Sequence, residues 1–247
     1  MFVELLKHAS TQLSKSKNLT LLVLCSFLAL NCGKDEDLVA ICENLSDTTI
    51  LSEQEAYFIE LTLDNLPSEE IPRLKKWQKD IAIFIEGTPN QELLSILNAA
   101  IVELNLLDGT IKIDTVSSLE AANLRFFFGT PQEYAATIEP NITSINDDVS
   151  SIVTIASNNV SAIERASICN DHINFPDLEF QQHSIRQVLA RSLGLKNPST
   201  SFTTSIFNDT ITTNTAYSPL DREMIELMLG TNLKPGFCPN TIVKAIN

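Results

Sequence analysis

The expected fold follows from one stretch of the chain, IAIFIEGTPNQELLSILNAAIVELNLLDG, residues 81–109. Its first five residues, 81–85, are all apolar, which is typical of a strand that is buried on both faces. Residues 87–90 break this run, and from residue 92 to 107 apolar side chains recur at helical spacing. A buried strand followed by an amphipathic helix predicts a sheet with helices packed against it.

The same reasoning extends to the rest of the chain. Apolar and β-branched runs predict further strands at 111–113, 123–128, 151–156 and 161–168, with a turn at 157–159. Capping residues and helical spacing predict helices that begin near Ser52 and Thr130, and others over 180–195 and 219–229. Strands and helices alternate first, and helices cluster last. This order predicts an α+β fold, a single domain over residues 51–247 in which helices pack on a mixed β-sheet.

An apolar run lies ahead of this domain, in the passage LLVLCSFLALNCGKDED at residues 21–37. The run, 19–30, is shorter than the roughly 20 residues of a spanning helix, and three lysines precede it. It resembles a bacterial lipoprotein signal, in which the cysteine is acylated. The resemblance implies a signal peptide over 1–31, lipidation at Cys32 and a flexible acidic tether over 32–50. The other interpretation is a buried helix with an ordinary thiol at Cys32.

The acidic residues that follow Lys34 are similar to the export signal of surface lipoproteins of the Bacteroidota. This resemblance implies a lipid-anchored protein of the outer membrane, displayed on the cell surface. The chain has a formal net charge of −14. So acidic a surface repels phosphate backbones and anionic lipid, which argues against nucleic acid as a partner and leaves the lipid anchor as the link to the membrane.

Cysteines and glycines limit the chemistry that the domain can carry. Without Cys25 in the signal and the acylated Cys32, three of the five cysteines remain, so at most one intramolecular disulfide can form among Cys42, Cys169 and Cys238. Domain termini often lie close together, which favours the pair Cys42 and Cys238. No cysteine has the spacing of a metal site, and the seven glycines form no phosphate-binding loop.

Four segments of the last third carry a second resemblance: VLARSLGL at 188–195, SIF at 205–207, YSPLD at 217–221 and MIELML at 224–229. Their order and spacing resemble the carboxy-terminal half of a metzincin-type zinc peptidase. They are most similar to an uncharacterised family of bacterial zinc-dependent proteases. In such enzymes a helix carries HExxHxxG, a turn with a methionine lies under the metal, and a final helix begins with an aspartate. The resemblance implies a metzincin-like domain.

The zinc site that the resemblance would imply is replaced. The first ligand position falls at Gln187, the catalytic glutamate at Val188, the second ligand at Arg191 and the third at Asn197, while Phe207 stands at the turn methionine. A fixed cation repels zinc, and valine cannot act as a general base. The sequence therefore predicts no catalytic residue, no bound metal and no cofactor.

Three side chains on the corresponding helix share one face, because His183, Gln187 and Arg191 follow at four-residue steps. One interpretation is a solvated face. The other is a candidate cleft, formed by these three residues and Asn197, that binds a protein, peptide or glycan. His172 is expected to be exposed or satisfied in its loop, and Asp221 to begin a helix. Glu164 and Arg165 are expected to be edge charges.

Two classes of function are compatible with these features. The first is a surface lipoprotein whose catalytically inactive, peptidase-like domain serves in binding or assembly. The second is a metal-dependent hydrolase with a relocated metal site, for example on His172 and His183 with Asp177 or Glu179. The replaced zinc positions favour the first class.

Overall fold

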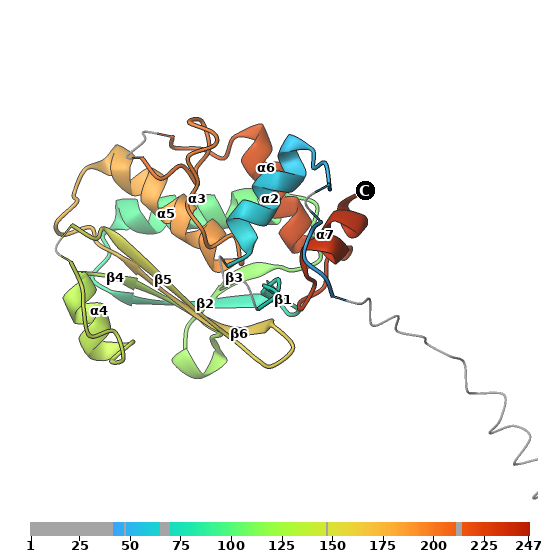
Figure 1. Ribbon diagram of the computed structural model, residues 1–247. Coiled ribbons are helices and arrows are strands. Elements are labelled where there is room, and N and C mark those ends of the chain that lie inside the picture. The colour runs from blue at the N-terminus through green and yellow to red at the C-terminus, as the bar shows by residue number, and fades with distance from the viewer. Residues whose placement is uncertain (1–41, 47, 65–69, 147, 211–213) are drawn as a thin grey trace, which may run out of the picture. The chain divides into compact units, whose positions relative to one another are not determined.

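A six-stranded, mostly parallel sheet forms the centre of the computed structural model, which describes residues 42–46, 48–64, 70–146, 148–210 and 214–247 (Figure 1). Five strands follow the order β1-β6-β4-β2-β3 and run parallel, while β5 pairs with β6 in the antiparallel direction. The strands are β1 (Lys76–Trp77), β2 (Ile81–Gly87), β3 (Ile113–Val116), β4 (Leu124–Phe128), β5 (Ser151–Ser157) and β6 (Ala162–Asn170). The predictions for residues 1–31 and for Cys32 lie outside the described residues.

Helices cover the two faces of this sheet unequally. The α-helices of the described residues are α2 (Glu53–Thr62), α3 (Gln91–Asn105), α4 (Pro131–Thr137), α5 (Leu178–Ser192), α6 (Pro219–Leu229) and α7 (Pro239–Ile246). Figure 1 shows α2, α3, α5 and α6 over one face, whereas α4 and the short 3-10 helix η1 (Leu119–Ala121) lie on the other. Residues 42–247 form one compact unit. The predicted mixed sheet with packed helices is confirmed at this level.

The unequal cover corrects one prediction about β2. Ile81 and Ile83 are fully buried under the helices, but Ala82 and Phe84 are only half-buried on the opposite face. The strand therefore alternates, as expected where a sheet has one covered and one partly open face. The expectation that it is buried on both faces is wrong, because α4 and η1 cover only part of the second face.

Helix α5 ends where the backbone at Gly194 approaches the backbone at Lys75. Asp177 caps its start by accepting a hydrogen bond from the Phe180 amide at 2.8 Å. Gly194 follows its end with a φ of +115°, and an added Cβ there would lie 2.4 Å from the Lys75 carbonyl oxygen. Only glycine combines this left-handed conformation with so little space.

Lys76 in β1 is the most deeply buried cation of the described residues, with 4% of its surface exposed. Its ammonium donates a hydrogen bond to the carbonyl oxygen of Met228 in α6. Burial lowers the pKa of Lys76 to about 8 from the 10.5 of an ordinary lysine. Between these two values the unfolded chain binds more protons than the folded one, so this lysine makes stability rise with pH.

We expect the wild type to gain about 1 to 2 kcal/mol in free energy of unfolding relative to Lys76→Met between pH 7.5 and 9.5. Urea unfolding of both proteins at the two pH values measures this difference. Lys75→Met is the control, since it removes a partly exposed lysine and should keep the wild-type dependence. A difference between wild type and Lys76→Met that does not change with pH would contradict the prediction.

Candidate functional site

The polar stripe of α5 lies inside the protein. His183 is 5% exposed, Gln187 and Arg191 are half-buried, and the other faces of the helix pack in the core. The prediction of a solvated face is therefore wrong. The physical reason is that the segment 196–214, as far as it is described, lies against the stripe and supplies it with backbone carbonyl groups.

Each of the three side chains contacts one carbonyl of that segment. The Nδ1 atom of His183 lies 3.0 Å from the Asn214 oxygen, and Nε2 of Gln187 donates to the Ile206 oxygen at 2.8 Å. Nε of Arg191 donates to the Lys196 oxygen at 3.0 Å. These contacts satisfy polar groups that would otherwise be costly to bury.

A hollow of about 350 Å³ opens beside the stripe. We call it the α5 hollow; it is lined by Ser150, Phe180, His183, Ser184, Gln187, Arg191, Pro198, Asn208, Asp209 and Thr210. Three of the four predicted cleft residues thus meet at one hollow. Asn197 does not line it, because its amide donates to the Glu60 and Leu63 oxygens at the end of α2.

Burial lowers the pKa of two groups in the α5 hollow. Desolvation lowers the pKa of His183, so the ring is neutral at physiological pH, although the Asn214 carbonyl and Asp221 oppose this shift. Desolvation also lowers the pKa of Arg191, and nearby Asp209 opposes that shift. Because a guanidinium remains charged even so, the hollow contains one fixed cation with a carboxylate at its rim.

The positions at which the metzincin resemblance would place a zinc site offer no ligand set. Val188 is fully buried in the core, as is Phe207. Within the described ranges, no three His, Cys, Asp or Glu side chains gather closely enough to hold a metal ion. His172, Asp177, Glu179 and His183 therefore do not form the relocated site of the alternative hypothesis.

A family model described as "Protein of unknown function (DUF2927)" matches residues 52–247. The chain belongs to this DUF2927 family. The match contains every element from α2 to α7 and therefore both sides of the α5 hollow. No curated protein matches the chain.

Asp221 has a second role in the DUF2927 domain that local sequence reasoning missed. As predicted, it begins α6, and its Oδ2 accepts from the Ser218 amide at 2.8 Å. The same carboxylate also accepts from the Ile206 amide at 3.0 Å and from the Ser205 hydroxyl at 2.5 Å. Tyr57 extends the network, donating to Ser205 at 2.7 Å. Asp221 thus fixes the 205–207 turn that accepts the hydrogen bond from Gln187.

The surroundings of three other residues differ from those that the sequence predicted. His172 is neither exposed nor satisfied: its buried Nδ1 has no hydrogen-bond partner among the described residues, because its ring packs edge-on against Phe128. Glu164 and Arg165 are exposed but not on an edge strand, since β6 lies between β4 and β5. Strand pairing is a long-range property that the sequence run alone did not reveal.

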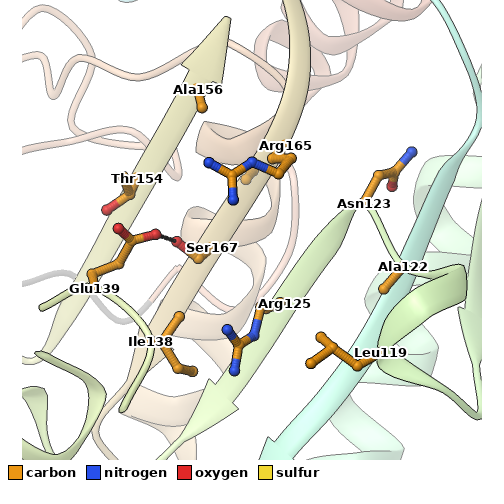
Figure 2. A pocket seen from close by; sticks show the side chains of 11 residues that line it. Leu119, Ala122, Asn123, Arg125, Ile138, Glu139, Thr154, Ala156, Arg165 and Ser167 are labelled. Carbon is orange, nitrogen blue, oxygen red and sulfur yellow. Dashed lines mark hydrogen bonds between the residues drawn. The ribbon is translucent and has the colours of Figure 1, made fainter. Parts of the chain in front are cut away.

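A second hollow, of about 290 Å³, lies on the partly open face of the sheet (Figure 2). We call it the sheet-face hollow. Four of its polar side chains come from neighbouring strands: Thr154 from β5, Arg165 and Ser167 from β6, and Arg125 from β4. None of these residues was predicted as a site, because their separation in sequence hides their proximity.

Among the described residues, no helix is both long and apolar enough to span a membrane.

Proposed function

We propose that this protein is a lipid-anchored surface protein whose DUF2927 domain binds a ligand in the α5 hollow without hydrolysing anything there. The observation that carries the proposal is the α5 hollow itself, a recess whose polar side chains include Gln187 and Arg191, at the positions where a metzincin would carry zinc ligands. Both side chains donate hydrogen bonds to backbone carbonyl oxygens and so stabilise the wall of the recess. A protein, peptide or glycan segment is the class of ligand that we propose.

The arrangement around α5 supports a metzincin-like origin for this domain. The turn at 205–207 lies next to α5, held there by the bond from Gln187 to the Ile206 oxygen. The final part of the resemblance, an aspartate at the start of the next helix, is Asp221, which fixes the same turn from the other side. Helix, turn and aspartate therefore contact one another in the order that the resemblance implies.

The side chains in the α5 hollow argue against hydrolysis. A general base must reach the reacting water, whereas Val188 points into the core and has no proton to exchange. His183 is almost fully buried, and its Nδ1 is occupied by the Asn214 carbonyl. Arg191 would repel a metal ion at the position of the second ligand.

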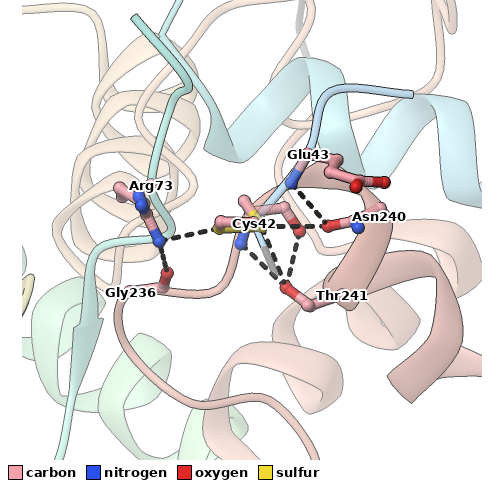
Figure 3. Close-up of a disulfide and its surroundings, with 7 residues drawn as sticks. Cys42, Glu43, Arg73, Gly236, Asn240 and Thr241 are labelled. Carbon is pink, nitrogen blue, oxygen red and sulfur yellow. Dashed lines mark hydrogen bonds between the residues drawn. A yellow bond between two sulfur atoms is a disulfide. The ribbon is translucent and has the colours of Figure 1, made fainter. Parts of the chain in front are cut away.

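The disulfide supports export from the cytoplasm. Cys42 and Cys238 are bonded, with their Cα atoms 5.7 Å apart, as the favoured pairing predicted (Figure 3). Arg73 donates to the Gly236 oxygen nearby at 3.1 Å, and the Cys238 amide donates to Thr241 Oγ1 at 2.8 Å. Disulfides persist in oxidising compartments, where lipoproteins reside after export.

The proposal is tested on the full chain, produced in a bacterium that processes lipoproteins and purified from its membranes in detergent. We expect the protein to incorporate labelled fatty acid at Cys32 and to contain no stoichiometric zinc, and a chelator should leave its melting temperature unchanged. A metal that binds only the folded state would raise that temperature by mass action.

Three variants make the two halves of this test specific. Cys32→Ala should abolish the label, whereas Cys25→Ala, a cysteine inside the apolar run, should keep it. Label that survives in Cys32→Ala would contradict the anchor. Tightly bound zinc that is lost in His183→Ala would contradict the non-catalytic hypothesis and favour a relocated metal site.

A further inference from the structure

The sheet-face hollow is built by side chains that strand register brings side by side. Thr154 and Arg125 both pair with Ser167, one from each side of β6. Arg165 precedes Ser167 by two residues and so projects from the same face of the strand. Figure 2 shows the four side chains over adjacent strands, with Ile138 and Leu119 at the sides. The hollow lies on the face of the sheet opposite α5, far from the site proposed above.

Most polar groups of this hollow already have partners. Arg125 forms a two-pronged ion pair with Glu86, with nitrogen–oxygen distances of 2.6 and 2.8 Å. Glu139 accepts from the Ser167 hydroxyl at 2.5 Å, and Asn123 bonds the backbone at Ala82 and Asp80. These contacts make the walls rigid and leave these groups little capacity for a ligand.

Arg165 is the exception. It is exposed, and its guanidinium forms no hydrogen bond or ion pair with the residues that the structure describes, although it lines the hollow. The neighbouring Glu164 forms no ion pair with it; the carboxylate of Glu164 accepts a hydrogen bond from Asn158 at 3.2 Å. In a chain with a net charge of −14, which offers many carboxylates as partners, a guanidinium left free above a recess is notable.

The remaining surface of the hollow is apolar. The apolar side chains that line it are Leu119, Ala122, Ile138 and Ala156. Its volume of about 290 Å³ is near the lower end of ligand pockets, which span about 300 to 1,000 Å³. One cation that is unpaired among the described residues, at the side of a small recess with both polar and apolar walls, fits an anion with a compact apolar body.

We propose that the sheet-face hollow binds a small monocarboxylic acid with an apolar body, its carboxylate paired with Arg165. A guanidinium matches the planar carboxylate with two parallel hydrogen bonds. Thr154, whose hydroxyl accepts from Tyr134 at 3.2 Å, can donate its own proton to a ligand oxygen. The carboxylate of Glu139, which lines the hollow, disfavours a ligand with more than one negative charge. This site is independent of the function proposed for the α5 hollow.

Binding of benzoate to the full chain, purified in detergent, tests this proposal by titration calorimetry. Benzamide is the matched probe, because it has the same ring without the charge. We expect benzoate to bind with a millimolar or lower dissociation constant, and benzamide and inorganic phosphate to bind at least tenfold more weakly. Partitioning of a probe into detergent is common to all variants and cancels between them.

Three variants separate the contributions. Arg165→Gln should weaken benzoate binding at least tenfold, while Lys79→Gln, which removes an exposed charge elsewhere, should not change it. Ala156→Leu places extra volume beside Arg165, its partner in the strand register, and should also abolish binding. Melting temperatures verify that each variant is folded. Equal affinity for benzamide, equal affinity for phosphate, or wild-type binding in Arg165→Gln would overturn the proposal.

Discussion

Loss of the disulfide between Cys42 and Cys238 is expected to lower the free energy of unfolding by about 3 to 5 kcal/mol. The bond joins residues 196 positions apart, so it closes a loop that contains almost the whole domain. A long loop restricts the unfolded chain strongly, which is the main source of stabilisation in the chain-entropy model. The double variant Cys42→Ala/Cys238→Ala, unfolded in urea, measures the effect.

Cys169→Ala is the control for this experiment. Cys169 is buried and free, and burial raises the pKa of its thiol to about 12, so it remains protonated and unreactive. Reductant should destabilise Cys169→Ala as much as wild type, and should not affect the double variant. If reduced and oxidised wild type unfold at the same urea concentration, the disulfide contributes nothing to stability.

Asp221→Ala is expected to cost about 3 to 4 kcal/mol in free energy of unfolding. The carboxylate is fully buried and accepts hydrogen bonds from the amides of Ser218 and Ile206 and from the hydroxyl of Ser205. The substitution leaves these donors buried without their acceptor and also detaches the 205–207 turn from α6. Thermal or urea unfolding gives the size of the loss.

Ser218→Ala tests which of the two roles of Asp221 matters more. It removes the side-chain cap of α6 but leaves the bonds from Asp221 to the turn, and should cost only about 1 kcal/mol. Asp114→Ala, an exposed carboxylate in β3, should have almost no effect. If Asp221→Ala costs no more than Ser218→Ala, the carboxylate is a helix cap only.

Local sequence patterns correctly predicted the helices whose ends are determined by capping residues. Helix α6 begins at Pro219 and ends at Leu229 as predicted, because a serine cap, a proline and an acidic residue in the first turn determine its start. Helix α3 begins within one residue of its prediction for the same kind of reason, the Asn90 cap. By contrast, β1 has two residues and exists only through its pairing with β6, and α7 was not predicted at all.

In the candidate site, too, some features were predictable from local sequence and others depended on residues distant in the chain. Sequence spacing placed His183, Gln187 and Arg191 on one helix face, since this depends only on the period of the helix. Whether that face meets water depended on the described parts of the segment 196–214, which lie along it and bind each of the three side chains through a carbonyl. Asn197 follows Lys196 in sequence, but its side-chain amide donates to the Leu63 oxygen at the end of α2 instead.

From the amino-acid sequence alone we could predict the helices whose caps and periodicity are local, and could recognise the strong acidity of the chain and the apolar run before Cys32. Tertiary structure was needed to show that Asp221 fixes a turn fifteen residues away and that Arg165, which has no partner among the described residues, lines a recess. The physical reason is that these features depend on strand pairing and on helix packing. Both bring together residues whose separation in sequence carries no signal.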